Sequence, residues 1–391
     1  MKDLLLCSDF YPVIGGAHHW LYNVYRRWPN PVTVFAGSQA NNDAGAAERQ
    51  RAFDSEDHAS LSIHRIDLPS LDIDILDSAF WKRLITAVRL IAAETGNSQA
   101  TLHCLRSFPD GVVGLAWKAL APRRRRIVTF AHGEEITAVR TSRQLRVLGY
   151  WVYKVSALVI ANCLNTETLL RSLTPSAKIS VIHPGVSTSD FAFPEKELEY
   201  RRASYGFAHD DIVLVAVSRL APHKNHANVL KSIRRLLDLG MPLKYLVVGG
   251  GEEEQNLRTL AKDLGLDQVV KFAGVLSDRE RSLAMAIADI HIMPSILLEG
   301  FGIVFIEAAA AGIPSIAGNV GGQVEAVLHG KTGLVIDGTD MNAIVGAIRQ
   351  LAENRQLRRE MGEAGRRWAA AHEWQSLTVK TFEEIRRATR K

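Results

Sequence analysis

The amino-acid sequence predicts an α/β fold with two domains, each built on a parallel, doubly wound sheet. The chain has 391 residues, and a domain typically contains roughly 100–200 residues, so two domains suit its length. Short apolar runs of strand length alternate with longer segments of helical periodicity, which is typical of parallel strands joined by helices. This alternation begins near the N-terminus and begins again after Asp211.

The first series of predicted strands occupies the N-terminal half of the chain. Its apolar runs are residues 4–8, 32–36, 127–131 and 158–161. The polar stretch 38–60 is predicted to be a surface loop or a small excursion from the fold. We therefore place an N-terminal domain at residues 1–190.

The second series of predicted strands defines a C-terminal domain at residues 205–370. Its apolar runs are residues 212–217, 245–248, 269–272 and 313–317. The polar residues 187–209 separate the two series and are interpreted as a linker, and residues 371–391 as a C-terminal helix. Doubly wound sheets bind ligands beyond the C-terminal ends of their strands, so a cleft between the domains is the expected ligand site.

Composition narrows the class of protein. Lys and Arg (47) outnumber Asp and Glu (42), a net charge of +5 that suits a nucleic-acid binder and an enzyme of phosphorylated substrates equally. Cys7, Cys104 and Cys163 are far apart, which argues against a disulfide framework or a metal site and for a reducing compartment. The N-terminal apolar run is too short for a secretion signal, and no run approaches the roughly 18–20 residues of a membrane span. We therefore expect a cytoplasmic protein.

Two glycine-rich turns follow predicted strands. Gly15 and Gly16 lie where the first strand gives way to a helix, a place where a phosphate can approach backbone N–H groups, although a simple tight turn is at least as good an explanation. Residues 249–251 are glycines too, but three glutamates follow them and would repel a pyrophosphate. Neither turn has the G-x-G-x-x-G pattern of dinucleotide-binding enzymes, so a dehydrogenase is disfavoured.

Two cations follow the first strand of the second domain. Arg219 and Lys224 lie at its C-terminal end, five residues apart in a turn. An arginine fork and a lysine point charge suit a diphosphate, and a solvated loop or a helix-capping turn is the equally favoured alternative.

A further candidate site is the segment 294–312. Gly300 and Gly302 begin an alanine-rich helix whose free N–H groups would form an anion pocket, while Glu299 and Glu307 bracket its first turns. Each carboxylate can accept hydrogen bonds from vicinal hydroxyls, so one would hold a ribose and the other a hexose on either side of a diphosphate. Taken singly, such glutamates are usually solvated.

Together these motifs resemble glycosyltransferase family 4, which has the GT-B fold of two doubly wound, Rossmann-like domains facing each other across a deep cleft. The Glu-x7-Glu element with its upstream Arg and Lys is the most specific match. The matching residues are Tyr11, Pro12, Gly15, Gly16, His132, Gly133, Glu134, Ser218, Arg219, Leu220, Lys224, Phe272, Gly274, Ala288, Asp289, Pro294, Ser295, Glu299, Gly300, Phe301, Gly302, Glu307, Gly321, Gly322, Glu325, Gly330, Thr332 and Gly333.

The resemblance implies a retaining transfer of a hexose from a nucleotide-diphosphate sugar, such as a UDP- or GDP-sugar, with no obligatory metal or other cofactor. It implies that Arg219 and Lys224 stabilise the leaving diphosphate, that Glu307 holds the ribose, and that Glu299 contacts the donor sugar. His132, after the strand 127–131, is implied to lie near that sugar, although it also suits a structural hydrogen-bonding role. The donor phosphates would be lined by Gly15, Gly16, Gly300, Phe301 and Gly302. The C-terminal helix is implied to cross back onto the first domain.

Two features bear on the acceptor, which the resemblance leaves as a glycan, a lipid-linked molecule or a small molecule in envelope polysaccharide or glycoconjugate synthesis. Glu134 and Glu135 follow His132, and either could face the acceptor. Residues 138–157 are predicted to form one basic amphipathic helix, with Trp151 on its apolar side. On an anionic membrane it would make the protein peripheral on the cytoplasmic face; an ordinary domain helix is the alternative. Its candidate acceptor or membrane residues are Arg140, Arg143, Arg146, Trp151 and Lys154.

Other classes fit less well. A sugar-nucleotide epimerase or a phosphorylase of similar fold would bind related ligands, but the combination of Arg219, Lys224, Glu299 and Glu307 suits transfer better. A nucleic-acid-binding protein would need a contiguous cationic face with interleaved aromatic residues. The arginines cluster only at 123–126 and on the predicted helix, so we expect no nucleic-acid partner.

Overall fold

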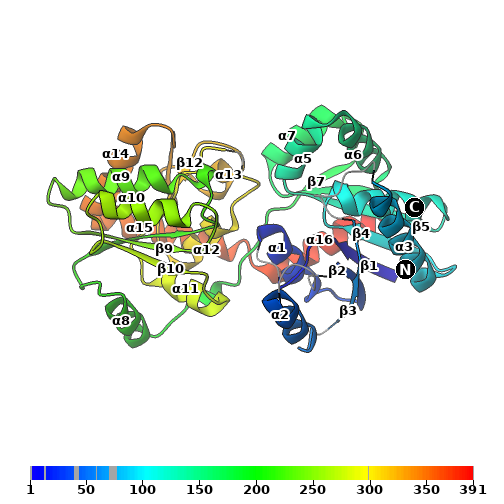
Figure 1. Ribbon diagram of the computed structural model, residues 1–391, viewed down its shortest axis with the longest axis horizontal. Coiled ribbons are helices and arrows are strands. Elements are labelled where there is room, and N and C mark those ends of the chain that lie inside the picture. Colours follow the sequence, from blue (N-terminus) through cyan, green and yellow to red (C-terminus); the bar gives the residue numbers. More distant parts are fainter. Residues whose placement is uncertain are drawn as a thin grey trace. The chain divides into compact units, whose positions relative to one another are not determined.

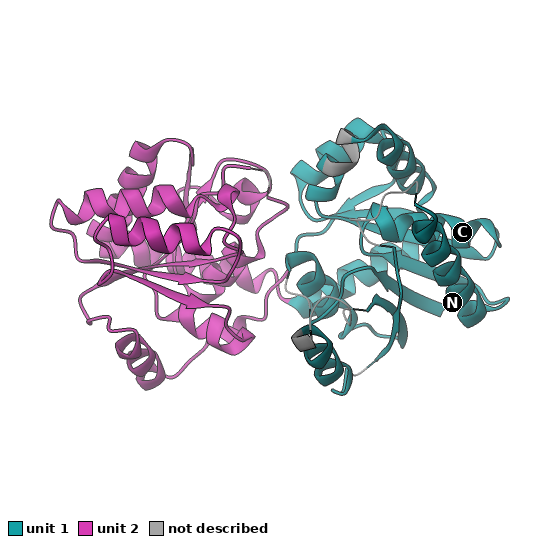
Figure 2. Cartoon of the chain, in the orientation of Figure 1, with its two compact units in different colours: residues 1–184, 374–391 teal, residues 185–373 magenta. Residues whose placement is uncertain are grey.

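The computed structural model describes residues 2–12, 15–38, 44–58, 60–69, 77–297 and 299–390, except for the side chains of residues 44, 45 and 138–141. The chain forms two compact units (Figure 2): residues 1–184 together with 374–391, and residues 185–373. Each unit has its own parallel sheet and its own hydrophobic core. The predicted architecture of two α/β units is therefore confirmed.

The first unit is built on a seven-stranded sheet of order β3-β2-β1-β4-β5-β6-β7. Its central strand β1 pairs with β2 on one side and β4 on the other, so Leu5 lies opposite Val34 and His103. The leucines of β1 are fully buried because helices cover both faces of such a sheet. The strands are β1 (Lys2–Cys7), β2 (Val32–Gly37), β3 (Leu61–Ile66), β4 (Ala100–Cys104), β5 (Arg125–Ala131), β6 (Leu158–Ala161) and β7 (Ile179–Val181).

The helices of the first unit differ from the sequence prediction at two places. They are α1 (Gly16–Tyr25), α2 (Ala44–Asp54), α3 (Ser78–Thr95), α4 (Val112–Ala119), α5 (Glu134–Thr141), α6 (Arg143–Val155), α7 (Leu164–Leu173) and α16 (Trp374–Thr389), with a short π-helical turn η1 (Ser107–Gly111). The predicted loop 38–60 contains α2, whose Phe53 stacks on Tyr11 at 5.5 Å. The single helix predicted over 138–157 is wrong: Ser142 has an extended backbone and its hydroxyl accepts from Leu145 N, which ends α5 and caps α6.

The C-terminal helix α16 packs within the first unit (Figure 1). Thr378 donates to the carbonyl of Val24 at 3.4 Å, and Arg386 pairs with the buried Asp3 at 2.6 Å. The two segments where the chain passes between the units are tied together within the second unit, because Val186 N donates to the carbonyl of His372 at 2.9 Å.

The second unit is built on a six-stranded sheet of order β10-β9-β8-β11-β12-β13. Its strands are β8 (Ile212–Val217), β9 (Leu243–Val248), β10 (Val270–Gly274), β11 (Ile290–Met293), β12 (Ser315–Gly318) and β13 (Gly333–Ile336). Its helices are α8 (Glu195–Ser204), α9 (His226–Leu237), α10 (Glu254–Asp263), α11 (Asp278–Ala286), α12 (Ile303–Ala311), α13 (Gln323–Ala326), α14 (Met341–Glu353) and α15 (Arg355–Ala370), with 3-10 turns η2 (Thr188–Phe191) and η3 (Pro222–Lys224). Helices α9, α10 and α14 share one core with the sheet (Figure 1), and α11 and α12 pack against each other.

The segment 187–209, interpreted as a linker, is part of this second unit. It forms η2 and α8. Arg202 of α8 donates to Asp289 Oδ2 at 3.3 Å, and the same oxygen accepts from Val213 N of β8 at 2.9 Å. This ion pair, which links residues far apart in sequence, fastens α8 to the sheet.

Candidate active site

The turn that carries Arg219 and Lys224 leaves the C-terminal end of β8. After η3, Asn225 adopts a left-handed conformation with φ of 67°, and its side-chain amide donates to the carbonyls of Pro294 at 3.2 Å and Gly338 at 2.6 Å. Asparagine tolerates this conformation better than most residues, and here its amide also ties three loops together. The turn therefore has a fixed course across the strand ends.

The glycines 249–251 pack against this turn. A Cβ on Gly249 would lie 1.9 Å from the carbonyl oxygen of Ser218, and one on Gly251 would lie 2.4 Å from that of Leu220. The close approach allows Leu220 N to donate to the carbonyl of Gly250 at 2.9 Å. These glycines support the loop bearing Arg219 through backbone contact, which explains their presence without a dinucleotide.

The loop before α12 is supported in the same way. Gly322 N donates to the carbonyl of Glu299 at 2.8 Å, and a Cβ on Gly322 would lie 2.0 Å from the carbonyl oxygen of Gly300. Gly302 caps α12 with φ of 84°, a conformation that favours glycine. Phe301 is buried beside it. Gly300, Phe301 and Gly302 thus lead directly into the N-terminus of α12, where the sequence places them. The anion pocket stays a prediction.

The structure brings Lys224 and Glu299 together as an ion pair between Lys224 Nζ and Glu299 Oε1. Their side chains are only 13% and 7% exposed. Arg219, in contrast, is exposed and has no ion pair with any residue that the structure describes. Lys224, predicted to bind the diphosphate, is therefore paired with Glu299, which is predicted to bind the sugar. Arg219, the other predicted diphosphate ligand, is exposed to solvent.

Glu307 has a cationic partner that the sequence analysis missed. Arg281 of α11 donates from Nη1 to Glu307 Oε2 at 2.5 Å and from Nη2 to Asp278 Oδ1 at 3.2 Å. Glu307 raises the pKa of the Arg281 guanidinium, which is therefore charged at any ordinary pH. Both carboxylates near the N-terminus of α12 are thus neutralised by a cation, so they need not repel an anionic ligand. In the sequence Arg281 is marked only by its place in the mixed-charge segment 278–281, and nothing there points to Glu307.

His132 of the first unit is held at three points after β5. Its N–H donates to Glu135 Oε1 at 2.7 Å, its carbonyl accepts from Asn162 Nδ2 at 3.0 Å, and its Nε2 lies 2.8 Å from the carbonyl oxygen of Leu105. Since a carbonyl only accepts, Nε2 carries the hydrogen and Nδ1 is left as an acceptor. Burial and Arg106 lower the pKa of His132 to about 3, so the ring is neutral at physiological pH. With Nε2–H engaged by Leu105, the neutral ring can accept a hydrogen bond at Nδ1 but cannot serve as a charged acid there.

The two glutamates after His132 have different surroundings. Glu135 is buried, and its carboxylate receives backbone N–H groups at the start of α5, although burial raises its pKa. Glu134 is exposed. Glu135 therefore holds the His132 loop in place through its carboxylate.

Gly15 and Gly16 lie at the start of α1, as predicted. Gly15 is the N-cap, and a Cβ there would lie 2.8 Å from His18 Nδ1. Arg106, another residue that the sequence analysis missed, pairs with Asp9 at 2.9 Å at the end of β1. Arg106 therefore places a cation at the C-terminal ends of the strands of the first unit, close to the start of α1.

The basic residues proposed for the acceptor or a membrane divide between α5 and α6. Arg140 belongs to α5, and its side chain lies outside the described part of the structure. Arg143, Arg146 and Lys154 of α6 are exposed. Trp151, expected on the apolar side, is 46% exposed with Lys154 Nζ 4.9 Å from its ring centre. This corrects the prediction for Trp151 alone. The other residues of the predicted apolar side, Leu145, Leu148, Val152 and Val155, do pack against the core.

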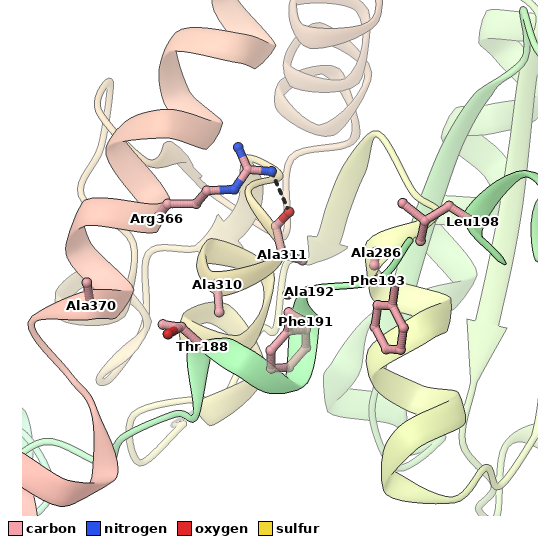
Figure 3. Close-up of a pocket in the computed structure, with 10 residues that line it drawn as sticks. All are labelled: Thr188, Phe191, Ala192, Phe193, Leu198, Ala286, Ala310, Ala311, Arg366 and Ala370. Carbon is pink, nitrogen blue, oxygen red and sulfur yellow. Dashed lines mark hydrogen bonds between the residues drawn. The ribbon is translucent and has the colours of Figure 1, made fainter. Parts of the chain in front are cut away.

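A cavity of about 510 Å³ lies in the second unit (Figure 3), among η2, α8, α11, α12 and α15. Arg366 reaches across its wall and donates to the carbonyl of Ala311 at 3.1 Å. Ala310 and Ala311 line it at the C-terminal end of α12, whereas Glu299 and Gly300 precede its N-terminus. The cavity contains none of the predicted site residues. Within the described residues, no cluster of His, Cys, Asp and Glu is arranged to hold a metal ion.

Comparison with known proteins places both units in one family. Residues 13–190 match Glycosyltransferase Family 4, and residues 199–368 match Glycosyl transferases group 1. The GDP-mannose-dependent alpha-(1-6)-phosphatidylinositol monomannoside mannosyltransferase of Mycobacterium tuberculosis is 34% identical, with 98% of each chain covered. A GDP-mannose-dependent monoacylated alpha-(1-6)-phosphatidylinositol monomannoside mannosyltransferase of Corynebacterium glutamicum is 29% identical, with 95% of this chain and 94% of the relative covered.

Solved structures support the fold. Anabaena HepE in complex with UDP superposes with a TM-score of 0.80 at 20% identity, covering 98% of this chain and 99% of the other. Sucrose-phosphate synthase from Thermosynechococcus elongatus superposes with a TM-score of 0.79 at 20% identity, covering 99% of each chain. No helix within the described ranges has the length and apolar character needed to cross a membrane. The chain belongs to glycosyltransferase family 4, and its two units have the GT-B fold.

Proposed function

We propose that the protein is a retaining hexosyltransferase that moves a sugar, mannose being the first candidate, from a nucleotide-diphosphate donor to a lipid-linked glycan acceptor of the cell envelope. The observation that carries the proposal is the charge arrangement around the N-terminus of α12. Lys224 and Arg281 neutralise Glu299 and Glu307, while Arg219 and the helix N–H groups can receive a diphosphate. The mannosyltransferases of Mycobacterium and Corynebacterium that use GDP-mannose support this donor.

In the proposed reaction, the bond between the anomeric carbon and the diphosphate oxygen breaks, and the oxygen of an acceptor hydroxyl forms the new bond to that carbon. The hydroxyl proton passes to the departing diphosphate. Arg219, Lys224 and the α12 N-terminus stabilise the charge that develops on the leaving diphosphate. Glu307 accepts hydrogen bonds from the ribose and Glu299 from the donor sugar. The donor phosphates are lined by Gly300, Phe301 and Gly302. In the first unit, the turn formed by Gly15 and Gly16 is proposed to line the phosphates as well.

His132 is assigned a hydrogen-bonding role toward the donor sugar. Its neutral ring has Nε2–H engaged with Leu105, so Nδ1 is the atom that would accept a sugar hydroxyl. An epimerase or a phosphorylase remains the alternative class. It predicts conversion or phosphorolysis of the nucleotide sugar without an acceptor.

We further propose that the first unit, residues 1–184 and 374–391, binds the acceptor, and that α6 lies on an anionic membrane surface. Exposed Arg143, Arg146 and Lys154 would meet anionic head groups, and exposed Val147 and Trp151 would enter the interface. Sedimentation with vesicles containing phosphatidylglycerol tests this. Binding that falls with added salt and is lost in Arg143→Glu/Arg146→Glu supports it, whereas equal sedimentation of that variant contradicts it.

Thermal-shift screening tests the donor assignment. The protein would be melted with UDP, GDP, ADP, TDP and their common sugar conjugates, because a ligand that prefers the folded state raises Tm by mass action. A selective shift that disappears in Glu307→Ala supports the proposal. No shift with any nucleotide, in protein shown to be folded, contradicts it.

A further inference from the structure

Arg281 occupies an unusual position for an arginine on a surface helix. It lies on α11, whose first turn is fixed by a capping box between Ser277 and Glu280. Its side chain is only 21% exposed, and its two terminal nitrogens bind different carboxylates, Glu307 Oε2 at 2.5 Å and Asp278 Oδ1 at 3.2 Å. A planar guanidinium held at two points has little freedom to rotate.

Glu307 depends on this contact. Its side chain is 4% exposed, and it projects from the second turn of α12, where the helix backbone fixes its Cα. Burying a charged group is costly unless an opposite charge and hydrogen bonds accompany it. Arg281 is the cation that the described structure provides, and it engages Oε2.

We propose that Arg281 is a positioning residue for the nucleotide ribose: it holds Oε2 of Glu307 and so turns the carboxylate to let Oε1 accept the ribose hydroxyls. This inference rests on the proposed function, because it takes Glu307 as the ribose-binding residue. Part of the specificity for ribose would then come from Arg281 on α11, whereas Glu299 and Glu307 belong to α12 and the loop before it.

A purely structural role is the competing explanation, in which the ion pair simply ties α11 to α12. The same helix provides a matched comparison. Arg279 pairs with Glu197 of α8 at 2.7 Å, but its side chain is exposed and its partner lies outside the candidate site. Arg279→Met removes one arginine and one helix-to-helix ion pair without touching Glu307.

The test measures discrimination between a ribonucleotide and its deoxy analogues by isothermal titration calorimetry. GDP, 2′-deoxy-GDP and 3′-deoxy-GDP are titrated into the full chain, or the uridine series if the thermal-shift screen selects UDP. The natural protein and Arg279→Met are expected to bind GDP about tenfold more tightly than the deoxy analogues, the effect of one hydrogen bond to a charged group. Arg281→Met is expected to bind GDP about tenfold less tightly and to bind all three ligands alike.

The outcomes separate the inference from the proposed function. Suppose that Glu307→Gln loses the preference for GDP over the deoxy analogues while Arg281→Met keeps it, even with all three ligands bound more weakly by the same factor. The positioning role is then overturned and the ribose assignment stands. If Glu307→Gln keeps full discrimination, Glu307 does not bind the ribose and the donor-site assignment itself fails.

A second variant decides the matter if Arg281→Met does not fold. Arg281→Lys keeps the charge, but a single ammonium group cannot hold Glu307 and Asp278 in the same fork geometry. It is expected to lose most of the discrimination while retaining the melting temperature. Discrimination equal to that of the natural protein in Arg281→Lys overturns the positioning role.

Discussion

Replacing Glu299 with Gln tests whether the donor diphosphate competes for Lys224. In the structure Lys224 Nζ contacts Glu299 Oε1; Glu299 is buried and the Lys224 side chain is 13% exposed. An incoming diphosphate must share the ammonium group with this carboxylate. Glutamine keeps the shape and one acceptor oxygen but removes the negative charge.

The expected effects on stability and on binding have opposite signs. Breaking a buried ion pair costs about 3–5 kcal/mol, and the remaining glutamine oxygen reduces this to roughly 2 kcal/mol, a fall in Tm of about 4–8 °C for a unit of this size. Two charges about 4 Å apart attract by about 4 kcal/mol at an effective dielectric of about 20. Recovering about a third of that on binding would tighten nucleoside-diphosphate affinity by about tenfold.

Calorimetric titration with GDP and GDP-mannose, and with the uridine pair, checks this. The nucleotide sugar is expected to gain less affinity than the diphosphate, or none, because the substituted side chain no longer offers a carboxylate to the sugar hydroxyls. Glu197→Gln is the control, since its exposed ion pair with Arg279 is worth at most about 1 kcal/mol. If Glu299→Gln weakens both ligands equally, the carboxylate does not compete with the diphosphate and the reasoning is refuted.

Three further predictions follow from other contacts. Glu307→Ala is expected to raise the donor Kd about tenfold, whereas Lys224→Ala mainly lowers kcat if its charge matters most in the transition state; equal loss of donor binding in both variants contradicts this division. Gly322→Ala places a Cβ 2.0 Å from the carbonyl oxygen of Gly300 and is expected to weaken nucleotide binding at least tenfold. The control is Gly346→Ala in α14, which has open space around it and is expected to raise stability by about 0.5–1 kcal/mol. Unchanged binding in Gly322→Ala argues against a supporting role for this glycine. Burial raises the pKa of Asp110 from 3.8 to about 7, so its folded state binds the proton more tightly and stability falls as pH rises between about 4 and 7; melting curves should lose part of that fall in Asp110→Asn, and an unaltered pH profile contradicts the prediction.

Much of the fold was predictable because apolar runs mark parallel strands directly. The runs 212–217 and 245–248 became β8 and β9 almost residue for residue. Strand β11 has only four residues and contains His291, so its pattern was too short to recognise. The break at Ser142 was missed because helical periodicity continues across it, and only the local cap reveals it.

The local positions of Glu299 and Glu307 at the start of α12 were predictable, but their ion-pair partners were not. The spacing of Glu299 and Glu307 is a property of one helix and its preceding loop, which a sequence displays. Arg281 and Arg106 act through residues 26 and 97 positions away, respectively, so their roles depend on which elements pack together. The glycines 249–251 could be explained from the sequence by a bound phosphate. The structure explains them by the close approach of the Ser218 backbone, which a sequence does not display.

The position of α16 affects how the protein is made. Residues 374–389 complete the first unit, and Arg386 neutralises Asp3 in its interior, so that unit cannot finish folding until the final helix has left the ribosome. The second unit is continuous in sequence from 185 to 373 and can close earlier. We therefore expect residues 185–373 to fold as a separate fragment, whereas the first unit alone would need residue 184 joined to residue 374. A stop codon before α16 would leave the first unit, and not the second, incomplete.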